Sequence, residues 1–123
     1  MTPFGKKVRE MRAARGIALK AMAHEIGVSP AYLSALEHGH RGKPTWYLVQ
    51  KIVSFFNVIW DEAEDLERLA QISDPRVTLN TAGLSPVVTE AANVFEKKIK
   101  SLSEIEAQAI LGILAKVDDR SSA

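Results

Sequence analysis

A short loop rich in cations, residues 38–43, holds the side chains best suited to binding chemistry. It carries Arg41 and Lys43, two glycines, and the imidazoles of His38 and His40. Fixed positive charges bind phosphate oxygens, and the glycines let the backbone approach them closely. The two histidines add hydrogen-bond donors, and positive charge when they are protonated. The loop is therefore predicted to contact the phosphates of a polyanion.

Metal binding and catalysis are alternative uses for these residue types. His38 and His40 lack a third ligand at a suitable spacing, and the chain has no cysteine to supply a thiolate for zinc. Serine, histidine and aspartate occur, but no nucleophile elbow, glycine-rich phosphate cradle or HExxH sequence accompanies them. We therefore expect neither an enzyme nor a bound metal or cofactor. The absence of cysteine also suits a reducing cytoplasm, where we expect the protein to act.

The segment before the loop is predicted to form two short helices joined by a tight turn. Apolar residues recur at helical spacing in its first half: Ile17, Met22, Ala23 and Ile26. Gly27 ends the first helix, because glycine adopts left-handed dihedrals without a steric penalty. Ser29 then caps a second helix that has Pro30 in its first turn. A helix, a short turn and a second helix form a helix-turn-helix unit.

Further helices are expected on both sides of this pair, so the predicted fold class is all-α. They cover residues 3–15, 46–56, 61–72, 86–101 and 103–117, as judged from apolar periodicity and capping residues. The β-prone sequence VTLNT at 77–81 predicts a short strand between the helices at 61–72 and 86–101. The domains are then a five-helix unit at 1–73, a linker at 74–86, a helical dimerisation region at 87–117 and a frayed tail at 118–123.

Charge is distributed unevenly along the 123 residues, although the net charge is only +1. Residues 1–51 hold nine Lys and Arg against three Glu, which gives +6. Residues 52–123 hold seven basic and twelve acidic side chains, which gives −5. A basic half suits a polyanionic partner, and the acidic half is expected to stay away from that surface. No apolar run is long enough to span a bilayer, so no membrane partner is expected.

The last two predicted helices carry wide apolar stripes that need a partner. The residues expected in this interface are Phe95, Ile99, Leu102, Ile105, Ile110, Ile113 and Leu114. Two helices of this size do not make a stable domain alone. They either pair with a second copy of the chain or pack back on the five-helix unit. We favour a homodimer, since stripes this wide resemble an interface core cut in half.

The first 72 positions resemble the lambda-repressor-like, or Xre, family of helix-turn-helix domains. The resemblance lies in VREMRAARG at 8–16, AMAHEIGVS at 21–29 and YLSALEHGHRGKP at 32–44. It implies a fold of five helices and operator binding by a dimer, generally to repress transcription. The C-terminal 50 residues carry no module that we recognise.

The resemblance also implies roles for single residues. Arg12 of the first helix and Glu37 at the end of the recognition helix match a pair that ties this helix to its scaffold. The residues expected to contact DNA are Lys20, Ser29, Pro30, Ala31, Tyr32, Ser34, Ala35, His38, His40, Arg41 and Lys43. Alanines offer bases only apolar contact, so direct base recognition by this helix is expected to be thin. At the start of the helix before the turn, Ala18 and Leu19 stand where the family has a polar cap followed by glutamine. This difference is expected to weaken the contact of that first helix with a phosphate.

These expectations combine into a dimeric repressor that binds double-stranded DNA at a pseudo-palindromic operator. Two-fold symmetry places the half-sites about 34 Å apart, one helical turn of DNA. Two alternatives of another class remain open. The chain is an antitoxin that neutralises a toxin through its acidic half, or an activator that contacts RNA polymerase through the acidic helix at 61–72.

Overall fold

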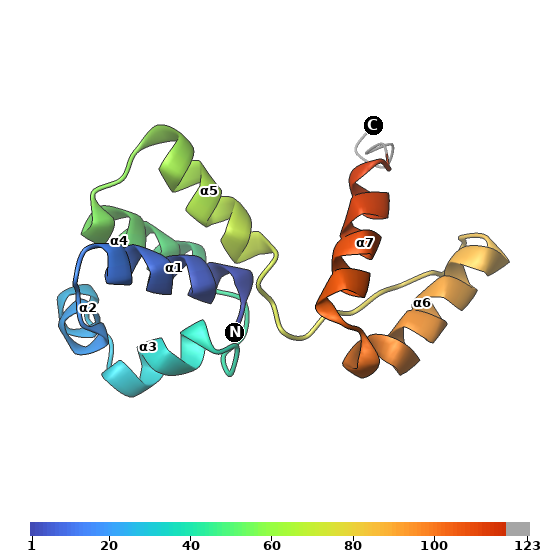
Figure 1. Ribbon diagram of the computed structural model, residues 1–123, viewed down its shortest axis with the longest axis horizontal. Coiled ribbons are helices and arrows are strands. Elements are labelled where there is room, and N and C mark those ends of the chain that lie inside the picture. Colours follow the sequence, from blue (N-terminus) through green and yellow to red (C-terminus); the bar gives the residue numbers. More distant parts are fainter. Residues whose placement is uncertain (118–123) are drawn as a thin grey trace. The chain divides into compact units, whose positions relative to one another are not determined.

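The computed structural model describes residues 1–117, and the regular structure in this range is entirely helical, which confirms the predicted all-α class. The chain divides into two units, of which the first is Met1–Val77 and the second begins at Thr78. The first contains α1 (Pro3–Ala14), α2 (Leu19–Ile26), α3 (Pro30–Glu37), α4 (Trp46–Phe56) and α5 (Trp60–Gln71) (Figure 1). The second contains α6 (Pro86–Lys98), a short 3₁₀ turn (Ile99–Ser101) and α7 (Glu104–Ala115). The predicted frayed tail, 118–123, lies outside the described residues.

Side-chain caps begin most of these helices, which explains why their starts are readable in the sequence. A hydroxyl accepts a hydrogen bond from a first-turn amide at Thr2, Ser29, Thr45, Ser85 and Ser103. Three of the helices also have proline in the first turn, where a missing N–H costs nothing. The structure shifts α5 by one residue from its expected start, and the last turn of the helix expected at 86–101 is 3₁₀.

One apolar core holds the first unit together, and all five of its helices contribute. Its fully buried centre is formed by Phe4, Val8, Met22, Leu33, Ile52 and Leu66. Each of these residues lies on a stripe of three- and four-residue steps, the spacing that puts side chains on one face of a helix. Figure 1 shows α2 and α3 forming one corner of this unit, with α1 beside both α3 and α5.

The strand expected at 77–81 is wrong: this segment is irregular in the structure. A strand needs a neighbour to pair with, and no other extended segment in the described range offers one. Its polar groups bond locally instead. The Asn80 side chain accepts from the Ala82 N–H at 2.9 Å, and the hydroxyls of Thr81 and Thr89 lie 2.9 Å apart. Local side-chain bonds of this kind compete with sheet ladders.

The second unit has helices but no buried side chain on any of them. Its two α-helices are joined through the 3₁₀ turn, and α7 starts with a capping box in which Ser103 and Glu106 each bond the other's backbone N–H. Large apolar residues along both helices are exposed, among them Phe95, Ile105 and Ile113. In the described range no helix is both long and apolar enough to cross a membrane.

Candidate nucleic-acid interface

The turn between α2 and α3 fixes the angle at which the two helices meet. Gly27 ends α2 with φ +79°, and its N–H donates to the His24 carbonyl at 3.2 Å. The next residue, Val28, packs partly against the core. The Ser29 hydroxyl then accepts from the Tyr32 N–H at 3.0 Å and starts α3. The predicted helix-turn-helix unit is therefore present, with glycine at the one position of the turn that needs a left-handed backbone.

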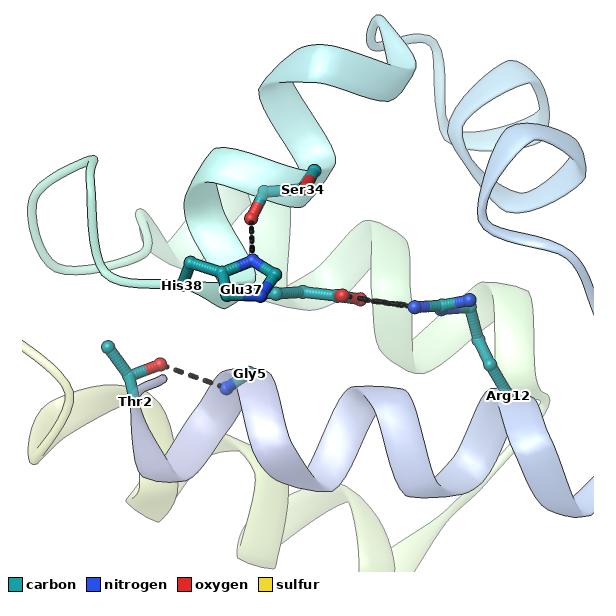
Figure 2. Close-up of polar contacts among 6 residues, drawn as sticks. All are labelled: Thr2, Gly5, Arg12, Ser34, Glu37 and His38. Carbon is teal, nitrogen blue, oxygen red and sulfur yellow. Dashed lines mark hydrogen bonds and ion pairs between the residues drawn. The ribbon is translucent and has the colours of Figure 1, made fainter.

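A buried ion pair attaches the end of α3 to α1. The Arg12 Nη2 lies 3.0 Å from both carboxylate oxygens of Glu37, and its Nε lies 3.3 Å from Oε2 (Figure 2). The side chains are only 10% and 3% exposed. The structure thus brings together the two residues that the family resemblance paired. A bidentate contact of this kind fixes direction as well as distance, so it constrains the orientation of α3.

The backbone of Glu37 is held a second time, by the start of α1. The Thr2 N–H donates to the Glu37 carbonyl at 3.2 Å, and the Thr2 hydroxyl caps α1 by accepting from the Gly5 N–H at 2.9 Å (Figure 2). Gly5 lies directly against this backbone: a Cβ added there would come within 2.6 Å of the Glu37 Cα. We did not predict a role for Thr2 or Gly5. A glycine near the start of an amphipathic helix was the one available signal of a close approach.

The face of α3 that remains free offers few hydrogen-bonding groups. Ser29, Pro30 and Ala31 are exposed, whereas Ser34 and Ala35 are half-buried. Tyr32 is half-buried too, and packs partly against the core. Tyr32 therefore covers part of the core and is also partly exposed on α3.

The loop after α3 folds its polar side chains onto neighbouring elements. His38 Nδ1 lies 2.9 Å from the Ser34 carbonyl (Figure 2), and the His40 ring stacks on His38 at a centroid distance of 6.5 Å. Lys43 Nζ donates to the Gln71 side chain at 3.2 Å, which connects the loop to the end of α5. The remaining loop cation, Arg41, lies over the Tyr32 ring with its Cζ 5.0 Å from the ring centroid. All four side chains are exposed, so they lie at the surface.

Lys20 lies apart from this group, on the first turn of α2, and is exposed. Ala18 precedes this helix and makes no side-chain cap, in keeping with the expected departure from the family pattern. The first-turn amides of α2 are therefore without a hydroxyl partner. Across residues 1–117 there is also no group of three or more His, Cys, Asp or Glu side chains placed to hold a metal ion.

Known proteins resemble this chain over part or most of its length. A family model described as Helix-turn-helix (HTH_3) matches residues 8–62. The uncharacterized HTH-type transcriptional regulator RghRB of Bacillus subtilis (strain 168) is 34% identical over 61 residues, which are 50% of this chain and 44% of that protein. The HTH-type transcriptional repressor RghR of the same organism is 27% identical over 107 residues, 87% of this chain and 68% of that protein.

Among solved structures, the SinR protein/SinI protein complex matches 80% of this chain and 99% of the matched chain, with 22% identity and a TM-score of 0.42. This chain spans less than half the length of RghRB. The family model spans α2, α3 and α4 together with parts of α1 and α5, which is the region in which the helix-turn-helix geometry was found. Residues 8–62 of this chain thus match the helix-turn-helix family model, in agreement with the predicted resemblance to the lambda-repressor-like (Xre) family.

Proposed function

We propose that this chain is a sequence-specific transcriptional regulator that binds a pseudo-palindromic operator as a homodimer and represses transcription. The repressor name of RghR supports the sign of regulation. The DNA-contacting residues are those expected from the sequence, with α3 in the major groove and the following loop on the phosphates. Half-sites about 34 Å apart match a two-fold dimer on one face of the duplex.

One observation carries the proposal: α3 is anchored at its C-terminal end and free at its N-terminal end. The anchor consists of the buried Arg12–Glu37 pair and the Thr2 bond to the Glu37 carbonyl. At the opposite end, Ser29, Pro30 and Ala31 are exposed. Helix-turn-helix proteins contact base edges with the N-terminal residues of this helix. A rigid attachment that leaves this end accessible is what such contact needs.

The charges around α3 support the phosphate part of the interface. Arg41 and Lys43 are exposed on the loop that follows α3, and Lys20 is exposed at the start of α2. If each half of a dimer neutralises about three phosphates, the log–log dependence of affinity on salt has a slope of about −5. Glu37 is the one acidic residue among positions 29–43, and it is buried in its pair with Arg12, so no exposed carboxylate of α3 or its loop opposes this attraction.

The exposed apolar residues of α6 and α7 support the proposed homodimer. Phe95 is 40% exposed and Ile99 45% exposed, while Ile105 and Ile113 reach 79% and 66%. Exposed apolar surface of this extent marks interaction sites. A second copy is the proposed occupant because burying two such stripes against each other supplies the core that neither has alone.

The decisive experiment combines site selection with a measurement of mass, both on the full chain. Duplexes are selected from random DNA at two salt concentrations, and the selected motif is expected to be palindromic. Analytical ultracentrifugation is expected to give a dimer for the wild type and a monomer for Phe95→Glu. Asn93→Glu is the matched control: it adds the same charge to α6 about 200° away around the helix, so the dimer is expected to persist. A wild type that selects no motif contradicts the proposal.

A second function has one observation in its favour, the same uncovered face of α6 and α7. This face would also accept a different protein, as in an antitoxin that binds its toxin. A monomeric wild type that forms a stoichiometric complex with a neighbouring gene product would support this alternative. Contact with RNA polymerase through the acidic residues of α5 would appear as activation rather than repression at the selected site.

A further inference from the structure

The free face of α3 has too few hydrogen-bonding groups to recognise a base sequence alone. Ala31 and Ala35 provide only methyl groups, and Pro30 has no donor. The Ser29 hydroxyl already accepts a hydrogen bond from the Tyr32 N–H. The remaining hydroxyls, those of Tyr32 and Ser34, belong to half-buried residues. A sequence-specific protein built on this helix needs a donor from elsewhere.

Arg41 is the loop side chain best placed to supply that donor. Its Cζ lies 5.0 Å above the ring of Tyr32, the third residue of α3 and thus part of the end expected to enter the groove. Tyr32 packs partly on the core, so the ring is a fixed support. Stacking uses the flat face of a guanidinium and leaves the N–H groups along its edge free.

Two of the other polar side chains of the loop form hydrogen bonds, and the third, His40, stacks on the His38 ring. Lys43 donates to Gln71 on α5, and His38 contacts the Ser34 carbonyl within its own helix turn. Among the described residues Arg41 forms neither an ion pair nor a hydrogen bond through its side chain. Its guanidinium instead makes a cation–π contact with the Tyr32 ring. Its donors are therefore oriented but unused.

The path of the backbone explains how a loop residue reaches the start of α3. The His40 N–H donates to the Ala35 carbonyl at 2.9 Å, which holds the loop alongside the helix. The reversal occurs at Gly39, whose φ is +80°. That conformation favours glycine and lets the chain turn back after α3.

We infer that Tyr32 and Arg41 act as one recognition pair, in which the ring orients the guanidinium and Arg41 donates two hydrogen bonds to the O6 and N7 atoms of a guanine in the major groove. This inference rests on the proposed function, and it specifies which base the protein recognises and which residues do so. Arginine bound to O6 and N7 is the commonest specific contact with guanine. It differs from the expectation that Arg41, like Lys43, only neutralises phosphate.

The test measures preference rather than affinity alone. The full chain selects its site from random duplexes, and one guanine per half-site is expected to be strongly preferred. Arg41→Ala is expected to lose about 5- to 150-fold in affinity for that site relative to a non-operator duplex, the range of one bidentate base contact. Replacing the guanine by 7-deazaguanine removes the N7 acceptor, so it should weaken the wild type and leave Arg41→Ala unchanged.

Substitutions of Tyr32 and Lys43 distinguish the orienting effect of the ring from the effect of positive charge alone. Tyr32→Phe keeps the stacking surface and is expected to retain the guanine preference, whereas Tyr32→Leu should lose much of it while thermal unfolding confirms that the chain folds. Lys43→Ala is the matched control, expected to weaken binding to all duplexes alike. An Arg41→Ala variant that behaves as Lys43→Ala does, with equal losses on all duplexes and a shallower salt slope, overturns the inference. A wild type without any motif would contradict the proposed function itself.

Discussion

The buried Arg12–Glu37 pair gives the sharpest prediction on stability. Arg12→Ala removes the cation and leaves a carboxylate whose side chain is 3% exposed, with neither of its two 3.0 Å contacts to Nη2. Breaking a buried pair in this way costs about 3–5 kcal/mol, because the remaining charge is desolvated without compensation. At about 4–8 °C per kcal/mol for a domain of this size, Tm falls by at least about 12 °C.

The assay is urea and thermal unfolding of the full chain, followed by far-UV circular dichroism. The matched control is the Asp65–Arg68 pair, whose N–O distance is a shorter 2.7 Å but whose side chains are 38% and 64% exposed. Arg68→Ala is expected to cost about 1 kcal/mol or less, since solvent screens exposed pairs. If Arg12→Ala costs no more than Arg68→Ala, burial does not govern the strength of these pairs and the reasoning is refuted.

A double substitution then separates stability from positioning. Arg12→Met combined with Glu37→Leu replaces the buried pair with apolar side chains, a change that is often neutral or stabilising. The double variant is expected to unfold near the wild-type temperature. Its affinity for the selected operator should still fall, because the bidentate contact that fixes the direction of α3 is gone. A stable double variant with full affinity would show that the backbone contacts of Thr2 and Gly5 suffice.

Three further predictions concern other local contacts. Gly5→Ala forces a Cβ against the Glu37 backbone and is expected to cost about 1–3 kcal/mol of unfolding free energy, whereas Gly42→Ala, with nothing within 4 Å, should cost far less in the same urea titration. Ser73→Ala leaves the buried Phe4 N–H without its 2.9 Å acceptor and should cost about 1–3 kcal/mol, against no loss for the exposed Ser54→Ala. Hydrogen bonds from the Ser103 backbone and side chain lower the pKa of Glu106 below 4.5, so its contribution to α7 is present above pH 4.5 and is lost as the pH falls through the lowered pKa. Circular dichroism should show a loss of helicity at low pH in the wild type that is absent in Glu106→Gln. An identical pH profile for both proteins would contradict a contribution of the Glu106 charge to the stability of α7.

Much of the fold was predictable from local chemistry. Threonine or serine caps, first-turn prolines and apolar stripes mark the helix starts, and these signals act within a few residues of one another. The predicted strand at 77–81 failed because β-propensity describes how well residues fit a sheet, and pairing depends on segments elsewhere in the chain. Propensity alone does not reveal whether a partner strand exists.

The site was predictable to a different extent. The Arg12–Glu37 pair followed from the family resemblance, and the cations of the loop from composition. The buried Ser73 hydroxyl was not predicted, although it accepts from Phe4 N–H and donates to the Leu69 carbonyl at 2.6 Å. Nor was the stacking of Arg41 on Tyr32. The Phe4–Ser73 bond joins residues 69 positions apart, and the Arg41–Tyr32 contact depends on a loop path that no short-range signal specifies.

The proposed dimer connects two features of this chain: the few hydrogen-bonding groups on the free face of α3 and the exposed apolar residues of α6 and α7. Alanine and proline on the free face of α3 limit the energy that one half-site provides, even with the Tyr32–Arg41 pair added. Joining two such domains makes the second contact intramolecular, which raises overall affinity by about 10²- to 10⁴-fold without any new base contact. In the proposed dimer, the exposed apolar residues of α6 and α7 join the two domains. Under the proposed dimeric binding, a chain with more hydrogen-bonding groups on α3 would need this extension less, so the two features are consistent with each other.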